Sequence, residues 1–200
     1  AADREGAAQR TERVVVLEAD ARNQVQRVVD RLAGGLATDQ FGVDLNLGLG
    51  RIGTELAKRG SAFGMTVVAY DPFVEKSDYA IMKHDIKDVL NISDYVSLHL
   101  PLLDSTKGMI NSETLKEFKD GSFLINTGRG KTIIEEDVAD ALQSGKLAGF
   151  GNDVWYSDPP ESNPFADLPN VLMMPHLGAS TKENLLRIGI IIENIINEYV

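Results

Sequence analysis

The residues with the most specific chemical potential are three glycines in the hexapeptide GLGRIG, residues 48–53. In a G-x-G-x-x-G pattern, one glycine makes a tight turn, one lets the backbone approach a pyrophosphate, and one allows a helix to pack closely on a strand. A helix that begins at this turn also directs unpaired N–H groups and a partial positive charge towards the phosphates. Gly48, Gly50 and Gly53 therefore predict a cradle for the phosphates of a dinucleotide.

An acidic residue stands at the position that would select the sugar of the cofactor. Asp71 follows Gly53 by 18 residues and comes directly after an apolar, β-branched run, MTVVAY at 65–70. A carboxylate at this strand end accepts hydrogen bonds from the ribose hydroxyls of NAD and repels the 2′-phosphate of NADP. Together these features predict NAD as the cofactor. The alternative is a structural glycine turn with an unrelated aspartate.

Composition excludes several other kinds of site. The 200 residues carry 20 Lys and Arg against 30 Asp and Glu, and the net charge of −10 disfavours binding to nucleic acid or to anionic membranes. There is no cysteine, which excludes disulfides and thiolate chemistry. The three histidines, His84, His99 and His176, lack carboxylates at ligand spacing, so we expect no metal site. We expect His84 and His99 to be packing or surface residues.

The ends of the chain bear on its location. The first ten residues, AADREGAAQR, lack the apolar core of a signal peptide. The densest apolar stretch, 188–196, is interrupted by Glu193 and Asn194 and is too short to span a membrane. Together with the lack of cysteine, these features predict a cytoplasmic protein.

From residue 43 onward, strand-like and helix-like segments alternate. Strand-like runs fall near 43–48, 65–70, 95–100, 122–128, 147–155 and 170–175, and helical patterns near 51–64, 112–118 and 133–145. Gly145 stands where a glycine commonly ends a helix, and Ser180 with Glu183 predicts a capping box ahead of a last apolar helix. Strands that alternate with helices predict an α/β fold, a Rossmann-type doubly wound parallel sheet over residues 43–200.

One strand conflicts with that fold. The strand that leads into the glycine turn should be almost continuously apolar, because it lies in the middle of the sheet. It contains Asp44 and Asn46, and burial of either side chain without a partner costs about 1–3 kcal/mol. We therefore expect this strand to be short, shifted or placed at an edge.

The first 42 residues differ from the rest of the chain. They contain six arginines and no lysine, whereas residues 43–200 contain ten lysines and four arginines. Apolar residues recur there at helical spacing, at positions 14, 17, 21, 25, 28, 32 and 36. We interpret residues 1–42 as a separate helical segment, whether an appended piece, a fusion or a misread stretch of gene. Its apolar stripe and the isoleucine-rich last helix favour a homodimer.

Six motifs follow one another along the chain, namely GLGRIG, AFGMTVVAYDP, VSLHLPLLDSTKGMIN, FLINTGRG, DVW with DPP, and NVLMMPHLGAST. In this order they resemble the nucleotide-binding domain of the D-isomer-specific 2-hydroxyacid dehydrogenases, with phosphoglycerate dehydrogenase-like members most similar. The resemblance covers about residues 47–195. It implies an NAD-dependent oxidoreductase that transfers hydride between the cofactor and a D-2-hydroxy acid, with the 2-keto acid as the oxidised partner.

The resemblance also implies three catalytic residues. Arg129 in NTGRG matches the arginine that binds the substrate carboxylate, and its planar guanidinium suits bidentate capture. His176 in PHLG matches the general acid/base that takes the hydroxyl proton and returns it in the reverse direction. Asp158 stands where the family normally has a glutamate that hydrogen-bonds this histidine. Because aspartate is one methylene shorter, we expect that contact to lengthen or to need a water.

Further cofactor contacts follow from the same resemblance. Asp153 matches the aspartate that holds the nicotinamide carboxamide, Thr127 and Gly128 line the same ring, and Pro101 and Thr106 match the loop beside adenosine and phosphate. The remaining positions that the pattern places against the cofactor are Gly48, Gly50, Arg51, Ile52, Gly53, Asp71, Arg129, His176 and Gly178.

The substrate domain of the family is largely absent from this chain, and we expect the nucleotide half without the loops that close over the acid. Closure of such a domain excludes water and completes the site. One alternative is therefore a non-catalytic NAD-binding and dimerisation module, either similar to the co-repressors of the family or a truncated fragment. The tryptophan of DVW also resembles the formate dehydrogenase branch, although that branch carries glutamine at the position of Asp158.

Overall fold

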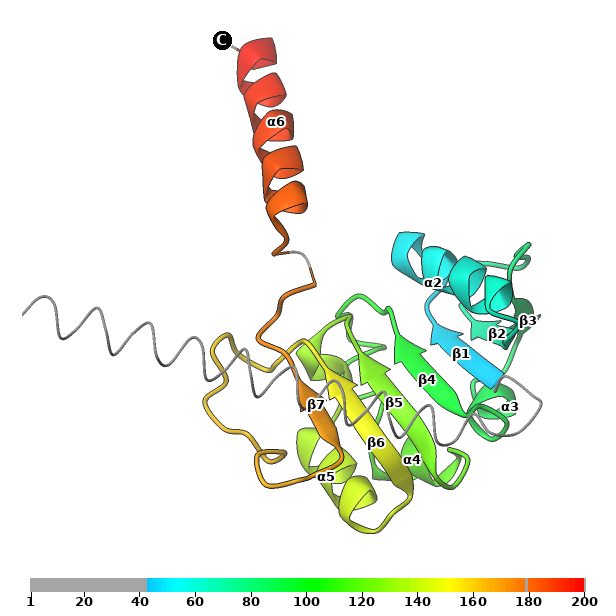
Figure 1. Ribbon diagram of the computed structural model, residues 1–200. Coiled ribbons are helices and arrows are strands. Elements are labelled where there is room, and N and C mark those ends of the chain that lie inside the picture. Colours follow the sequence, from blue (N-terminus) through cyan, green and yellow to red (C-terminus); the bar gives the residue numbers. More distant parts are fainter. Residues whose placement is uncertain (1–42, 179, 200) are drawn as a thin grey trace, which may run out of the picture.

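The computed structural model describes residues 43–178 and 180–199 (Figure 1). Their strands form one sheet in the order β3-β2-β1-β4-β5-β6-β7, and every neighbouring pair is parallel. The strands are β1 (Val43–Leu47), β2 (Thr66–Tyr70), β3 (Ile81–Lys83), β4 (Tyr95–Leu98), β5 (Ser122–Asn126), β6 (Leu147–Asn152) and β7 (Val171–Met173). The predicted α/β doubly wound sheet is confirmed. The helix predicted within residues 1–42 lies outside the described residues.

The direction in which the sheet grows changes between β1 and β4. From β1 the chain builds β2 and β3 outward on one side, and it then returns to lay β4 to β7 on the other side of β1. In a sheet with this strand order, the loops that leave β1 and β4 diverge and a crevice is expected above their carboxyl ends. In open parallel sheets this is the place where ligands bind.

β1 lies in the middle of the sheet. Its residues pair in register with β2 on one side and with β4 on the other, for example Leu45 with Val68 and with Val96. The predicted edge position is therefore wrong, because ladder hydrogen bonds follow both sides of the strand. The side chains of Asp44 and Asn46 lie outside the described part of the chain.

The helices cover both faces of the sheet. Helix α2 (Arg51–Ala62) lies on one face, where Ala57 packs with Val67 and Ala69 of β2. On the opposite face, Val68 belongs to a larger core, which α3 (Lys87–Leu90), α4 (Ser112–Lys116) and α5 (Glu135–Gln143) enclose. Successive residues of β2 thus point to opposite apolar layers, as a parallel sheet with two covered faces requires.

The ends of two helices test the capping predictions. Gly145 follows α5 with φ at +78° and donates its N–H to the carbonyl of Leu142 at 3.3 Å, which confirms the glycine stop. Helix α6 (Lys182–Tyr199) begins later than predicted. The hydroxyl of Thr181 accepts the N–H of Asn184 at 3.2 Å, and the carbonyl of Thr181 accepts the N–H of Leu185 at 3.0 Å. The N-cap is therefore Thr181, and the predicted capping box of Ser180 and Glu183 is wrong by one residue.

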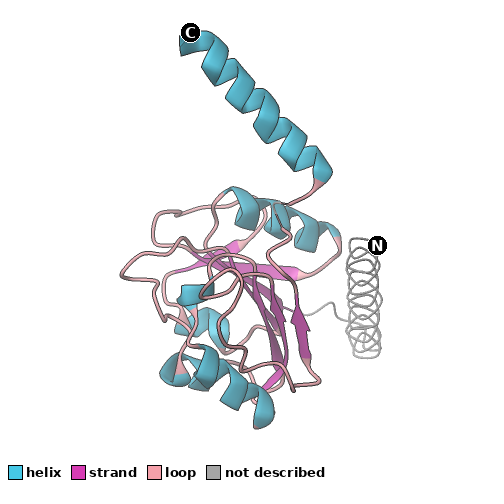
Figure 2. Ribbon diagram, turned by 90° about the vertical axis from the view of Figure 1, so that its left-hand side faces the viewer, coloured by secondary structure: helices cyan, strands magenta, loops and turns pink. Residues whose placement is uncertain are grey.

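Helix α6 projects away from the rest of the described chain (Figures 1 and 2). Its large apolar side chains are exposed by 43% to 61%, namely Leu185, Leu186, Ile188, Ile190, Ile191, Ile192, Ile195 and Ile196. Exposed apolar area of this extent is typical of a surface that another chain or domain covers. Within residues 43–178 and 180–199, no helix is both long and apolar enough to cross a membrane.

Candidate functional site

The three glycines of the first βα turn have three different surroundings. Gly48 has φ at +90°, and a Cβ atom there would lie 2.9 Å from the carbonyl oxygen of His99. A Cβ atom on Gly53 would lie 2.1 Å from the carbonyl oxygen of Gly48. Only glycine at position 53 therefore lets α2 pack this closely on the turn. A Cβ atom on Gly50 would meet no atom within 4 Å. The turn is therefore tight and closely packed on one side and open on the other.

The open side of the turn is also the amino end of α2. Gly50 is the N-cap residue, no side chain caps the helix, and its first turn contains no acidic residue. Arg51 and Ile52 lie exposed on this turn, and Ile52 is 66% exposed. The partial positive charge of the helix end is therefore available to an anion, and the space above Gly50 can receive a diphosphate.

Asp71 lies directly beside this turn, as the sequence spacing predicts. Its Oδ2 accepts the N–H of Leu49 at 2.7 Å, and its Oδ1 accepts the N–H of Phe73 at 2.8 Å. The two bonds fix the half-buried carboxylate at the end of β2, next to the glycines. Each oxygen keeps a second lone pair, so the carboxylate can also accept hydroxyl groups of a sugar.

His99 packs against the glycine turn. Its backbone N–H donates to the carbonyl of Leu47 at 2.8 Å, and its imidazole Cδ2 would lie 3.5 Å from a Cβ on Gly53. Nε2 lies 3.0 Å from the hydroxyl of Ser97, whereas the buried Nδ1 has no partner. Burial lowers the pKa of His99 to about 4, so the ring is neutral at pH 7. His99 is thus a packing residue, as expected. The sequence did not show that it packs against the glycine turn.

The loop after β4 is closed by a buried hydroxyl. Thr106 donates its hydroxyl to the carbonyl of Pro101 at 2.6 Å and accepts the N–H of Leu103 at 2.8 Å. Thr106 is only 7% exposed, whereas Pro101 is exposed. Thr106 therefore shapes the loop beside the crevice, and its hydroxyl is already engaged within that loop.

The loop after β5 presents Arg129. Thr127 and Arg129 are exposed, whereas Gly128 between them is buried. The guanidinium Nη1 of Arg129 donates to the carbonyl of Gly128 at 2.7 Å. Since a guanidinium has five N–H donors, most of its donors are left for another acceptor.

Asp153 ties the end of β6 to the loop after β7. Its Oδ1 accepts the N–H of Leu177 at 2.7 Å, and its Oδ2 accepts the N–H of Gly178 at 2.8 Å. These amides directly follow His176, whose φ is +55°. The structure thus gives Asp153 a role that the sequence did not suggest, since its carboxylate holds the loop that carries the histidine.

His176 and Asp158 are in hydrogen-bond contact across the last loop. Nδ1 of His176 lies 2.5 Å from Oδ2 of Asp158, and both side chains are about half exposed, at 44% and 51%. The expectation of a longer or water-bridged contact is wrong, because the turn at residues 157–161 brings the shorter side chain within direct reach. This contact leaves Nε2 of the imidazole as the nitrogen that can face a substrate.

All these residues follow the carboxyl ends of parallel strands, so they share one edge of the sheet. The glycines follow β1, Asp71 follows β2, Arg129 follows β5 and His176 follows β7. Three carboxylates make direct contacts along this edge, Asp71 with the glycine turn, Asp153 with the histidine loop and Asp158 with the histidine itself. The glycine turn and the His176–Asp158 pair therefore lie at the same rim of the sheet.

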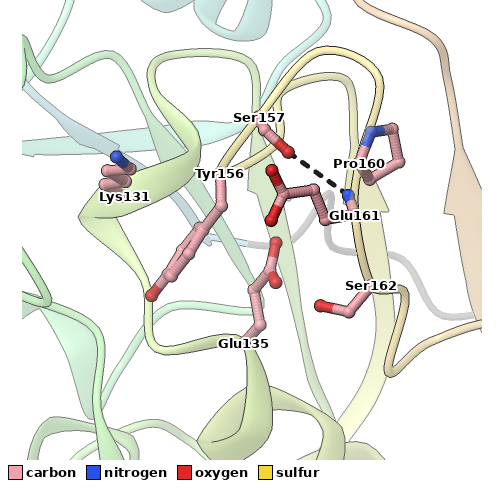
Figure 3. A pocket seen from close by; sticks show the side chains of 7 residues that line it. All are labelled: Lys131, Glu135, Tyr156, Ser157, Pro160, Glu161 and Ser162. Carbon is pink, nitrogen blue, oxygen red and sulfur yellow. Dashed lines mark hydrogen bonds between the residues drawn. The ribbon is translucent and has the colours of Figure 1, made fainter.

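A pocket of about 290 Å³ lies beside the turn that carries Asp158 (Figure 3). It is lined by Lys131, Glu135, Tyr156, Ser157, Pro160, Glu161 and Ser162. Tyr156 donates its hydroxyl to the carbonyl of Ile133 at 2.6 Å, and Ser157 accepts the N–H of Glu161 at 3.2 Å. Burial, and then the neighbouring Glu136, raise the pKa of Glu135. The walls of this pocket hold the turn in place.

Comparisons with known proteins agree with this arrangement. The chain matches the family described as D-isomer specific 2-hydroxyacid dehydrogenase, NAD binding domain, over residues 16–178. It is 42% identical over 156 residues to the hydroxypyruvate reductase of Thermotoga maritima, an alignment that covers 76% of this chain and 51% of that protein. It is 40% identical over 158 residues to the D-3-phosphoglycerate dehydrogenase of Bacillus subtilis, with coverage of 77% and 30%. The chain thus spans about half, or less, of these relatives.

Solved structures show the same fold. The D-lactate dehydrogenase of Aquifex aeolicus, complexed with NAD and lactic acid, superposes with a TM-score of 0.75 at 28% identity, over 88% of this chain and 61% of that one. The NAD-dependent formate dehydrogenase of Staphylococcus aureus, in complex with NAD, also gives 0.75 at 30% identity, over 80% and 49%. Motifs, fold and family match therefore agree, and the chain belongs to the NAD-binding domains of the D-isomer-specific 2-hydroxyacid dehydrogenases.

Proposed function

We propose that this chain binds NAD across the crevice and serves as the cofactor half of an enzyme that transfers hydride between NAD and a D-2-hydroxy acid. The observation that carries the proposal is the 2.5 Å contact of His176 with Asp158 at the sheet edge that also holds the glycine turn. Oxidation of a hydroxy acid needs a group that removes the hydroxyl proton and a site that orients a dinucleotide. Both stand on one rim of this sheet.

In this proposal the crevice holds the cofactor from both ends. The N–H groups of the turn around Gly50 and of the first turn of α2 bind the diphosphate, and Asp71 accepts the hydroxyls of the adenosine ribose. Thr127, Gly128 and Asp153 lie at the other end, beside the nicotinamide. When bound, NAD supplies the ring carbon that exchanges hydride with C2 of the acid.

The residues of the chain then act on the substrate. Arg129 donates N–H groups to the carboxylate of the acid and to its 2-oxygen, which fixes C2 over the crevice. His176 takes the hydroxyl proton on Nε2 during oxidation and returns it during reduction. Asp158 holds Nδ1, which orients the ring and stabilises the imidazolium while it carries the second proton.

The substrate we propose is a small D-2-hydroxy acid, phosphoglycerate-like in class. Support comes from two relatives, one named a hydroxypyruvate reductase and one a D-3-phosphoglycerate dehydrogenase. Isothermal titration should show binding of NAD well above that of NADP. The full-length enzyme that contains this chain should then oxidise NADH with at least one of hydroxypyruvate, phosphohydroxypyruvate and pyruvate, and Arg129→Ala should abolish that turnover. Turnover that survives Arg129→Ala, or turnover only with formate, would contradict the proposal.

A second candidate is a non-catalytic NAD-binding module that forms homodimers. The observation that favours it is α6, whose exposed leucines and isoleucines suit a partner surface. Such a module binds NAD and changes its sedimentation coefficient but turns over no 2-keto acid. A monomer at micromolar concentration, with and without NAD, would rule out the dimer.

The cytoplasmic location remains a prediction from the sequence and is tested by cell fractionation.

A further inference from the structure

A buried amide holds the loop that presents Arg129. Asn126 is the last residue of β5 and is fully buried. Its Oδ1 accepts the N–H of Gly128 at 3.1 Å, and its Nδ2 donates to the carbonyl of Arg129 at 3.1 Å. One side chain thus binds the peptide groups on both sides of the Gly128–Arg129 step.

A second buried side chain acts on the same carbonyl. Thr132 in the 3₁₀ turn η1 (Gly130–Thr132) is fully buried, and its hydroxyl donates to the carbonyl of Arg129 at 2.7 Å. The Arg129 carbonyl therefore accepts from two side chains that approach from β5 and from η1. Buried hydrogen bonds of this kind are costly to lose, because each leaves a desolvated group behind.

The glycines on either side of Arg129 pack closely against the neighbouring backbone. A Cβ atom on Gly128 would lie 3.1 Å from the carbonyl oxygens of Leu98 and Leu100, at the end of β4. A Cβ atom on Gly130 would lie 2.1 Å from the carbonyl oxygen of Trp155, in the segment after β6. The loop therefore packs between the segments that follow β4 and β6. The two hydrogen bonds of Asn126 fix the position of the loop backbone between them.

We propose that Asn126 is a positioning residue for the nicotinamide half of the bound dinucleotide, and through the same loop for Arg129. The inference rests on the proposed function, which places Thr127 and Gly128 beside the nicotinamide. Asn126 ends β5 and Asp71 follows β2, three strand spacings away, which corresponds to about 14 Å. Loss of the Asn126 amide should therefore disturb one end of the cofactor and spare the other.

The chain offers a matched control on the neighbouring strand. Asn152 ends β6, pairs in register with Asn126 and is 1% exposed. Neither polar atom of the Asn152 side chain has a hydrogen-bond partner. Replacement of either residue by alanine removes the same atoms at the same depth, but only at Asn126 does it release a loop.

The test compares two ligands that differ at the nicotinamide end. Isothermal titration of the full chain with NAD and with ADP-ribose, which lacks the nicotinamide, reports the affinity contributed by each half. For Asn126→Ala we expect NAD binding about tenfold weaker, with ADP-ribose binding changed by less than about twofold. Asn152→Ala should leave both affinities as in the wild type. Thr132→Val keeps the shape of the side chain and should lower the NAD affinity in the same selective way.

The outcomes separate the inference from the function on which it rests. If Asn126→Ala fails to fold, Thr132→Val decides the matter by the same ratio of affinities. An equal loss for NAD and ADP-ribose, or no loss for either, would overturn the role of Asn126 while leaving NAD binding intact. Equal wild-type affinities for the two ligands would also overturn it, because the loop would then contribute nothing to the nicotinamide end. A wild-type chain that binds neither ligand would refute the proposed function itself.

Discussion

Replacement of Gly50 by alanine separates binding from folding at the glycine turn. A Cβ atom there meets nothing within 4 Å, and φ of −69° with ψ of −163° is accessible to alanine. The gain from a less flexible unfolded chain, about 0.4–1 kcal/mol, is offset by the poorer N-cap propensity of alanine, so we expect little change in Tm. The methyl group instead occupies the open side of the turn. Loss of one hydrogen bond to a charged phosphate, about 1.5–3 kcal/mol, corresponds to about 10- to 150-fold weaker NAD binding.

Gly53→Ala is the control, because its effect on folding should be large. Its Cβ would lie 2.1 Å from the carbonyl oxygen of Gly48, so α2 must move away from the turn. Such overpacking costs about 1–3 kcal/mol or more, and we expect both Tm and NAD affinity to fall. Thermal unfolding gives the Tm of each variant, and isothermal titration gives its NAD affinity. Wild-type NAD affinity in Gly50→Ala, at unchanged Tm, would refute the assignment of this turn as the phosphate cradle.

Three further variants test other parts of the structure. Asn152→Leu should raise the free energy of unfolding by about 1–2 kcal/mol in urea titrations, because it removes a buried amide that has no partner; a lower stability would show that the amide has a partner after all. Asp71→Ala should weaken NAD binding about tenfold or more and narrow the preference over NADP, and an unchanged NAD/NADP ratio in titrations would argue against its contact with the ribose. Burial lowers the pKa of His99 to about 4, below the unfolded value of 6.5. Because the unfolded chain takes up the proton first, the free energy of unfolding should fall by about 2 kcal/mol between pH 7 and pH 5. Urea titrations at both pH values should show a smaller fall in His99→Gln, and an equal fall would assign the effect to other groups.

The elements that carry a strong local pattern could be predicted from the sequence. The order of strands and helices follows from alternating apolar runs, and the surroundings of Gly48, Gly50 and Gly53 are those that the spacing of the motif predicts. Asp71 lies beside the turn because the second strand of such a unit ends next to the first. β3 was not predicted, because three residues in a sheet edge carry too little periodicity to be distinguished from a loop.

The remaining contacts depend on loops and on tertiary packing. The direct reach of Asp158 to His176 depends on the path of residues 154–170, which no local pattern determines. The bonds from Asp153 to the amides of Leu177 and Gly178 join segments 24 and 25 residues apart. Asn126 and Asn152 have the same residue type at equivalent strand ends, yet both polar side-chain atoms of Asn126 are hydrogen-bonded and neither of Asn152 has a partner. Only the three-dimensional arrangement distinguishes such residues.

The uniform direction of the seven strands gives the molecule a front and a back. The back is the amino-terminal rim, where Lys146 pairs with Asp120 at 2.6 Å and Lys119 pairs with Asp94. Since the chain has no native cysteine, a single cysteine introduced at the exposed Asn91 ahead of β4, whose φ of −74° any residue can adopt, would be a unique attachment point. A dye or a surface linked there would lie a full strand length from the rim that carries the glycine turn and His176. The same polarity keeps the back of the molecule apart from the rim that carries the glycine turn and His176.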